Sequence, residues 1–351
     1  MANNTQAGKV QTVTGVISPN QLGTTLTHEH LLIDISILGG PPAEASARNF
    51  YYKPVSLETV GYIRHHAMRN LDNAQLLDVD TATDEAMLYK QHGGTSLVDA
   101  TSIGLSRDPK GLARISRATG VNIIMGSSHY VAPAHPPDMD SRSEDDIFEK
   151  IVRDVTEGVD DTGIKSGVIG EVGCSWPLTD NERKVLRASG RAQQATGAPI
   201  LIHPGRDETA PLEIIEVLSE VGADLSRTIM GHLDRTVFLH DTLLKIAESN
   251  CYMEWDLFGS EQSYYAPNPG IDMPGDARKM DDIAWIISEG YGGKIVVAHD
   301  ICAKQRLVKY GGHGYFYILN SIVPRMRARG FSEESIDKIL VDNPRDILTF
   351  V

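Results

Sequence analysis

Short apolar runs rich in β-branched residues alternate along this chain with longer stretches in which apolar residues recur at helical spacing. The short runs predict eight strands, at residues 25–33, 95–99, 122–125, 167–171, 200–203, 227–232, 251–255 and 294–299. The longer stretches predict helices at 83–92, 108–118, 144–157, 180–196, 211–221, 239–249 and 281–288. A repeated order of strand and helix is typical of parallel βαβ units, so the pattern predicts an α/β fold.

Two segments depart from the alternation. Residues 37–77 contain Pro41-Pro42 and a tyrosine-rich stretch, and they predict a long insertion after the first strand. Residues 9–18 carry β-branched side chains at period two, which predicts a hairpin able to close the bottom of a barrel. Because no repeat, low-complexity tract or linker interrupts the chain, we expect one domain over residues 1–351.

Composition narrows the class of protein. Of 351 residues, 41% are hydrophobic and 23% charged, as in soluble globular proteins, and no apolar run approaches the ~20 residues of a membrane-spanning helix. The net charge of −14 argues against a nucleic-acid partner, because such binding depends on cationic side chains. Three scattered cysteines and a polar N-terminus without a secretory signal favour the reducing cytoplasm. The oligomeric state stays open, with a homo-oligomer allowed.

The segment Thr27-His28-Glu29-His30 is the first candidate for chemistry. Residues two apart on a strand point the same way, so His28 and His30 present two imidazoles about 6.6 Å apart along the strand. Two histidines at this spacing can bind one metal ion.

Four later strands bring further ligand types to their carboxyl ends. Glu171, His203 and His232 close their predicted strands, and Asp300 follows the last one. In a parallel barrel all carboxyl ends lie on one face, where active sites are found. Four histidines and two carboxylates suit two zinc-like ions, which lower the pKa of bound water and stabilise an anionic intermediate.

Five of these segments together resemble the phosphotriesterase family of the amidohydrolase superfamily. They are Thr27-His-Glu-His, Val168-Ile-Gly-Glu-Val-Gly, Ile202-His-Pro-Gly-Arg, Met230-Gly-His-Leu-Asp-Arg and Val297-Ala-His-Asp. Residues 170–179 and 307–315 are most similar to the phosphotriesterase-related branch found in animals. The resemblance covers nearly the whole chain, and it implies a (β/α)₈ TIM barrel with a binuclear metal site at the C-terminal face.

The resemblance also implies a role for each ligand. His28, His30 and Asp300 would hold a buried metal, His203 and His232 an exposed one, and Glu171 would bridge both. Bacterial phosphotriesterases bridge their metals with a carboxylated lysine, whereas this chain has Glu171. Because a glutamate supplies the same two oxygens, the metal site is retained, but the bacterial substrate preference does not transfer.

Substrate contacts are assigned more loosely. Tyr130 matches a tyrosine that lines the metal site of related lactonases, with core packing as its alternative. Arg206, three residues after His203, lies on a loop of the catalytic face and could bind an anionic tail. Arg235, Lys304 and Arg306 also follow strand ends and compete for that role. Residues 311–315 are rich in glycine and predict a loop that shapes a pocket.

The leading hypothesis is a metal-dependent amidohydrolase in which hydroxide held between two metals, expected to be Zn²⁺, attacks a carbonyl carbon. Asp300 would take the proton and pass it to the leaving group. The subfamily resemblance implies N-acetyltaurine or a similar N-acyl amino-acid-like substrate with an anionic tail. Alternatives are a lactone, ester or phosphotriester hydrolase with the same centre, and a catalytically silent barrel retained as a binding protein.

Overall fold

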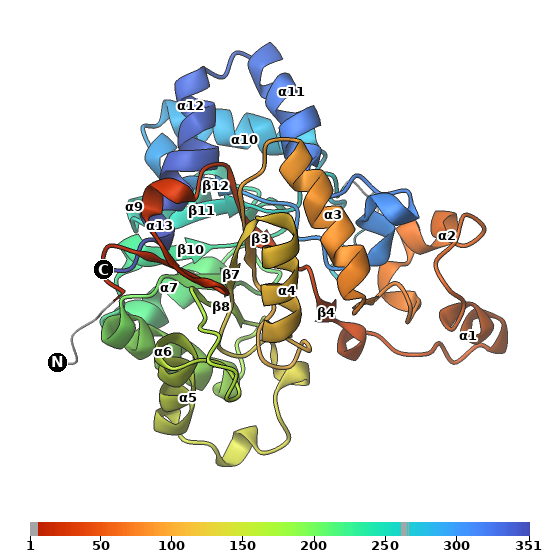
Figure 1. The fold of residues 1–351 in the computed structure, drawn as a ribbon, viewed down its shortest axis with the longest axis horizontal. Helices are drawn as coiled ribbons and strands as arrows, with labels where there is room; N and C mark the ends of the chain where they lie inside the picture. The colour runs from red at the N-terminus through yellow and green to blue at the C-terminus, as the bar shows by residue number, and fades with distance from the viewer. Residues whose placement is uncertain (1–5, 261–264, 266) are drawn as a thin grey trace.

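Eight parallel strands of the described chain form a barrel at the centre of the molecule (Figure 1). The computed structural model describes residues 6–260, 265 and 267–351. One group of strands contains β3 (Thr25–Glu29), β6 (Ser96–Asp99) and β7 (Asn122–Met125). The other contains β8 (Ile169–Gly173), β9 (Ile200–His203), β10 (Thr228–Met230), β11 (Tyr252–Trp255) and β12 (Ile295–Val297).

Backbone hydrogen bonds join the two groups of strands at both seams. Between β7 and β8, Gly170 N donates to Ser127 O at 2.8 Å, and between β12 and β3, Asp300 N donates to His28 O at 3.1 Å. The strands therefore follow one another around the barrel in sequence order, and all their carboxyl ends lie on one face.

Helices connect the strands and cover the barrel (Figure 1). They are α3 (Val79–Gln91), α4 (Pro109–Thr119), α5 (Glu144–Thr156), α6 (Asp180–Thr196), α7 (Ala210–Glu220), α8 (Leu233–Thr236), α9 (His240–Glu248), α10 (Asp276–Ser288), α11 (Val323–Ala328), α12 (Glu333–Asp337) and α13 (Asn343–Leu348). The predicted (β/α)₈ barrel is confirmed. No helix in the described ranges is long and apolar enough to cross a membrane.

Short helical turns complete the secondary structure. The 3₁₀ turns are Pro19–Gln21, Ser36–Leu38, Ala67–Arg69, Ala132–Ala134, Met139–Ser141, Leu225–Arg227, Gly292–Lys294, Lys304–Arg306 and Val308–Tyr310. Two π-helical turns, Ile318–Ile322 and Lys338–Asp342, lead into α11 and α13.

The predicted insertion after the first strand is confirmed. Its ends are joined by β4 (Ile33–Asp34), which pairs antiparallel with β5 (Gln75–Leu76). Between them, α1 (Ala45–Tyr51) and α2 (Val60–His65) project from one side of the barrel, at the right of Figure 1.

The predicted N-terminal hairpin consists of β1 (Val10–Thr12) and β2 (Gly15–Ile17), which pair antiparallel. Val10 is fully buried and packs with residues from the barrel strands, among them Ile124 and Leu201. Phe350 N donates to Lys9 O at 2.9 Å, so the end of the chain is fixed beside the hairpin. The hairpin thus covers the end of the barrel where the strands begin.

Several predicted boundaries were wrong. The first strand, predicted over 25–33, divides into β3 and β4, because Leu31 N donates to the Asp99 carboxylate at 2.7 Å instead of continuing a strand ladder. Helix α10 begins five residues before the predicted start, since Asp276 and Lys279 are buried charged residues that mask its apolar face. The C-terminal helices α11–α13 were not predicted, because their short segments carry little periodicity.

Candidate metal centre

The six ligand-type residues selected from sequence come together at the carboxyl end of the barrel. His28 lies in β3, Glu171 in β8 and His203 at the end of β9. His30 follows β3, while His232 and Asp300 follow β10 and β12. Strand β8 runs two residues past Glu171, so the prediction that Glu171 ends its strand was wrong, although its side chain still lies among the others.

Glu171 is the centre of this cluster. Its Oε1 is 3.4 Å from His30 Nε2. Its Oε2 is 3.4 Å from His28 Nε2, 2.8 Å from His203 Nδ1 and 3.6 Å from His232 Nε2. The two carboxylate oxygens therefore have different histidine neighbours, as a carboxylate that bridges two ions requires.

Asp300 lies on the most open side of the cluster. Its carboxylate is 3.2 Å from His30 Nε2, and its side chain is 16% exposed, against 5% or less for the four histidines and Glu171. Asp300 and His232 have φ values of +52° and +54°, which non-glycine residues adopt infrequently. Such backbone is common at functional sites, and here it turns the chain sharply just after each strand.

The residues present fit a binuclear metal site. The potential ligand atoms of His28, Glu171 and His232 lie within 4.8 Å of one another, and so do those of His28, His30 and Asp300. His28 Nε2 is fully buried and has no hydrogen-bond partner among the described residues. A buried polar atom without a partner is costly, so a ligand such as a cation would satisfy it.

The electrostatics of the cluster also favour cations. Burial opposes protonation of His30, but its hydrogen bonds to Asp300 and Glu171 outweigh burial and raise its pKa to about 10. Burial likewise opposes ionisation of Glu171, but the adjacent His203 and His28 hold the pKa of that carboxyl well below its usual range. Protons therefore accumulate on histidines beside an ionised carboxylate, where metal ions would supply positive charge instead.

Two carboxylates that the sequence reading missed contact these ligands from the side away from Glu171: Glu254 lies in β11 and Asp256 directly follows it. Asp256 Oδ1 is 2.7 Å from His232 Nδ1, and Asp256 Oδ2 is 3.2 Å from His28 Nδ1. Glu254 lies 3.1 Å from His28 Nδ1 and accepts from the Thr27 hydroxyl. Carboxylates in this position orient ligand histidines. Their two-residue spacing at a strand end matches that of His28 and His30, and this signal could have identified them.

The predicted substrate contacts Tyr130 and Arg206 lie near His203. The Tyr130 hydroxyl is 3.4 Å from each ring nitrogen of His203. Arg206 is half-buried, and its Nε donates to the Tyr265 hydroxyl at 2.9 Å. A Cβ on Gly205 would lie 2.7 Å from the Ser175 backbone, so glycine permits the tight turn that places Arg206 there.

Of the three cations that compete with Arg206 for an anionic tail, Arg235 is the one that contacts the side chain of a predicted metal ligand. It is 2% exposed, and its Nη2 lies 3.1 Å from His203 Nε2. Lys304 instead pairs with Asp72 of the insertion at 2.6 Å.

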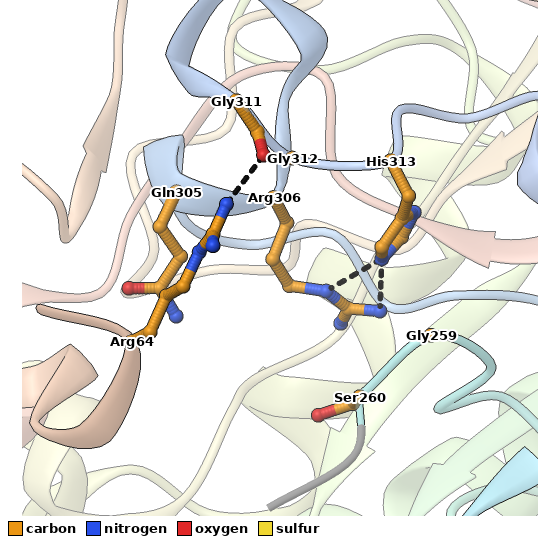
Figure 2. A pocket seen from close by; sticks show the side chains of 8 residues that line it. All are labelled: Arg64, Gly259, Ser260, Gln305, Arg306, Gly311, Gly312 and His313. Carbon is orange, nitrogen blue, oxygen red and sulfur yellow. Dashed lines mark hydrogen bonds between the residues drawn. The ribbon is translucent and has the colours of Figure 1, made fainter. Parts of the chain in front are cut away.

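The third cation, Arg306, lines a neighbouring pocket of about 360 Å³ (Figure 2). The lining residues are Arg64, Gly259, Ser260, Gln305, Arg306, Gly311, Gly312 and His313. Arg306 donates to the Asp300 carbonyl at 2.9 Å and contacts His313, as Figure 2 shows for the histidine. The glycine-rich segment therefore shapes a pocket, as predicted, but none of the six candidate ligands lines it.

Known proteins are similar to this chain in sequence and in fold. The family model described as "Phosphotriesterase family" matches residues 8–348. A phosphotriesterase-related protein of Nematostella vectensis and an N-acetyltaurine hydrolase of Xenopus tropicalis are each 46% identical to the chain, covering 98% of it and 99% of their own length. Among solved structures, a resiniferatoxin-binding protein from Rhodobacter sphaeroides superimposes with a TM-score of 0.93 at 34% identity, covering 97% of this chain and 95% of its own.

Proposed function

This chain belongs to the phosphotriesterase family of metal-dependent hydrolases, as its motifs predicted, and we propose that it cleaves the amide bond of N-acetyltaurine or a similar N-acyl amino-acid-like compound. The carrying observation is the buried Glu171 surrounded by four histidines, in a chain that matches an N-acetyltaurine hydrolase over nearly its full length. Cytoplasmic location, a single domain over residues 1–351 and the oligomeric state stay predictions.

The proposed cofactors are two divalent ions, for which Zn²⁺ suits the imidazole and carboxylate ligands. His28, His30 and Asp300 would hold one ion, His203 and His232 the other, and Glu171 would contact both. Bound there, the ions would supply Lewis acidity and an activated water. This division of the ligands follows the family resemblance. In the structure Glu171 Oε1 faces His30 and Oε2 faces His28, His203 and His232, so the carboxylate has neighbours on both oxygens.

Asp300 is the proposed catalytic acid and base. Its carboxylate is the most exposed member of the cluster, so it can meet both the attacking water and the substrate. It accepts a proton from that water and donates it to the leaving nitrogen, which an amine needs more than an alcohol does. The carboxylate lies 3.2 Å from His30 Nε2, the nitrogen that would share its metal ion.

Tyr130 and Arg206 are proposed to bind the substrate. The Tyr130 hydroxyl lies at the His203 side of the cluster. Among the described residues, the half-buried Arg206 guanidinium donates to Tyr265 through Nε and its terminal nitrogens have no side-chain partner, so they can meet an anion. A charged hydrogen bond is worth roughly 1.5–3 kcal/mol. Replacement of Arg206 by Met should therefore lower kcat/KM on an anionic substrate by roughly 10- to 150-fold.

Two measurements on the purified protein test this function. Metal analysis without chelator should give two ions per chain, and hydrolysis should be faster for N-acetyltaurine than for a lactone or a phosphotriester. Preference for either of the latter would reassign the substrate while keeping the centre. A chain without metal, inactive on all three after zinc is supplied, would instead indicate the silent binding barrel.

A further inference from the structure

Arg206 and Arg235 are two cations without acidic partners beside the proposed metal centre. Neither forms an ion pair with a carboxylate in the described parts of the chain, although Arg235 is almost fully buried. The hydrogen-bond partners of Arg235 in the described chain are neutral: the Pro204 carbonyl, the Thr236 hydroxyl and His203. By contrast, the buried Arg107 pairs with Asp154 at 2.9 Å. Unpaired buried charge is costly, so its retention here calls for an anion from outside the chain.

Arg206 and Arg235 are brought to the same turn. Arg235 Nη2 donates at 3.1 Å to the carbonyl of Pro204, two residues before Arg206 on the same tight turn. Two like charges repel unless an anion lies between them, so this arrangement favours a ligand with negative charge.

Metal binding would leave the Arg235 donor without its histidine acceptor. His203 directs Nδ1 to Glu171 and His232, and Nε2 to Arg235. If Nδ1 is the ligand atom, the neutral ring carries its proton on Nε2, which then cannot accept from Arg235. Arg235 Nη2 and His203 Nε2 would then be two hydrogen-bond donors that face each other beside the Tyr130 hydroxyl, without an acceptor between them.

We propose that Arg206 and Arg235 form a two-armed clamp for the sulfonate of the substrate, and that this clamp selects the spacer between the scissile amide and the anion. The inference rests on the proposed function for the identity of the anion. It adds Arg235 as a residue that contacts substrate and assigns it a role in specificity.

The length of the spacer that the clamp would select follows from the position of His203. The clamp faces one side of its ring and the proposed metal centre faces the other, so about the width of an imidazole separates them. The two-carbon spacer of N-acetyltaurine is of that order. A substrate with one more methylene between amide and sulfonate should lose roughly tenfold or more in kcat/KM.

The first test compares anionic and neutral substrates of equal length. The zinc-loaded Arg235→Met variant should lose roughly 10- to 150-fold in kcat/KM on N-acetyltaurine and change little on N-acetylethanolamine, which lacks the charge. Arg235→Lys should retain part of the anionic preference because it keeps the charge but not the planar fork. Preference for the shorter spacer should weaken in Arg235→Met.

The second test measures binding without turnover. Titration calorimetry with 1-propanesulfonate, a tail without an amide, should show binding to the wild type and at least tenfold weaker binding to Arg206→Met and Arg235→Met. Arg227→Met is the matched control, since Arg227 is also buried but donates to backbone carbonyls at the opposite end of β10. It should bind 1-propanesulfonate as the wild type does.

The outcomes separate the clamp from the proposed function. Equal losses on both substrates together with lost zinc would make Arg235 a support of His203 and overturn the clamp. Undiminished 1-propanesulfonate binding in both arginine variants would overturn it as well. A wild type that binds 1-propanesulfonate in a clamp-dependent way yet does not cleave N-acetyltaurine would refute the proposed substrate and leave the anion clamp standing.

Discussion

The two ends of the barrel bury opposite kinds of side chain. Where the strands begin, Val10 and Leu22 pack with Val98, Leu201 and other apolar residues under the hairpin. Where the strands end, imidazoles, carboxylates and a guanidinium are buried instead. The first end stabilises the fold by removing apolar surface from water, whereas the second concentrates charge that a folded chain buries only at a cost.

The buried arginines show the same difference. Arg227 precedes β10, and its guanidinium donates to the carbonyls of Asp346, Ile347 and Thr349 near the end of the chain. Arg235 follows β10 and faces His203. Arg227 binds the C-terminal segment to the barrel, whereas Arg235 is the proposed contact for an anion. A buried charge is therefore structural or functional according to which end of the strand it occupies.

Glu171→Gln should have the largest effect on activity, and it acts at the end of the barrel where the strands end. The amide removes the negative charge that the ligand histidines surround, so bound metal and kcat/KM should fall together, the latter by roughly 10³-fold. Metal analysis and N-acetyltaurine hydrolysis check this. Stability of the metal-free variant should fall below that of the metal-free wild type, because the neighbouring histidines lose the carboxylate that pairs with them. Two bound ions and full turnover would contradict the bridging assignment.

Leu22→Ala tests the end of the barrel where the strands begin, and it should change stability without changing activity. Leu22 is fully buried under the barrel, and its truncation should lower the free energy of unfolding by about 3 kcal/mol. Urea denaturation measures the loss. The folded, zinc-loaded variant should keep wild-type kcat and metal content, and a large fall in kcat would show that the two ends are coupled.

Asp300→Asn should lose ~10²-fold in kcat while KM changes little, because an amide can occupy the same place but cannot transfer a proton. Steady-state kinetics on N-acetyltaurine at fixed zinc loading provides the measurement. The loss should be smaller for an ester of equal size, since its leaving group needs less protonation. Near-normal turnover on the amide would assign the proton transfer to another residue.

The smallest expected effect is a pH dependence of stability from His129. Burial, followed by the charge of His135, lowers the pKa of His129 to about 3, and neither ring nitrogen has a hydrogen-bond partner in the described chain. The folded state therefore resists a proton that the unfolded state accepts below pH ~6.5, so this contribution is present above that pH and is lost towards pH 3.

Between pH 7.5 and 5.5, wild type should lose about 1.4 kcal/mol more stability than His129→Gln, which does not titrate. Urea denaturation of the metal-free proteins at both pH values gives this difference. The ligand histidines titrate in both proteins, so their contribution cancels. Equal losses would mean that His129 is accessible to protons in the folded state.

The sequence by itself determined the barrel and the six candidate ligands. Strand and helix periodicity located all eight barrel strands, and the rule that parallel strands end on one face predicted that His28, Glu171 and Asp300 lie together. Local signals also sufficed for α6, whose predicted range 180–196 is flanked by the caps Thr179 and Gly197, because capping depends on residues only a few positions apart.

Which polar side chains contact one another across different elements depends on the tertiary structure. Asp256, which directly follows β11, contacts both His28 and His232, and Arg235 rather than Lys304 lies at the ligand cluster. Nothing in the spacing of Lys304 reveals Asp72, because that partner comes from an insertion more than 200 positions away. Side-chain partners over such separations depend on packing between elements, whereas periodicity records only which face of its own element a residue occupies.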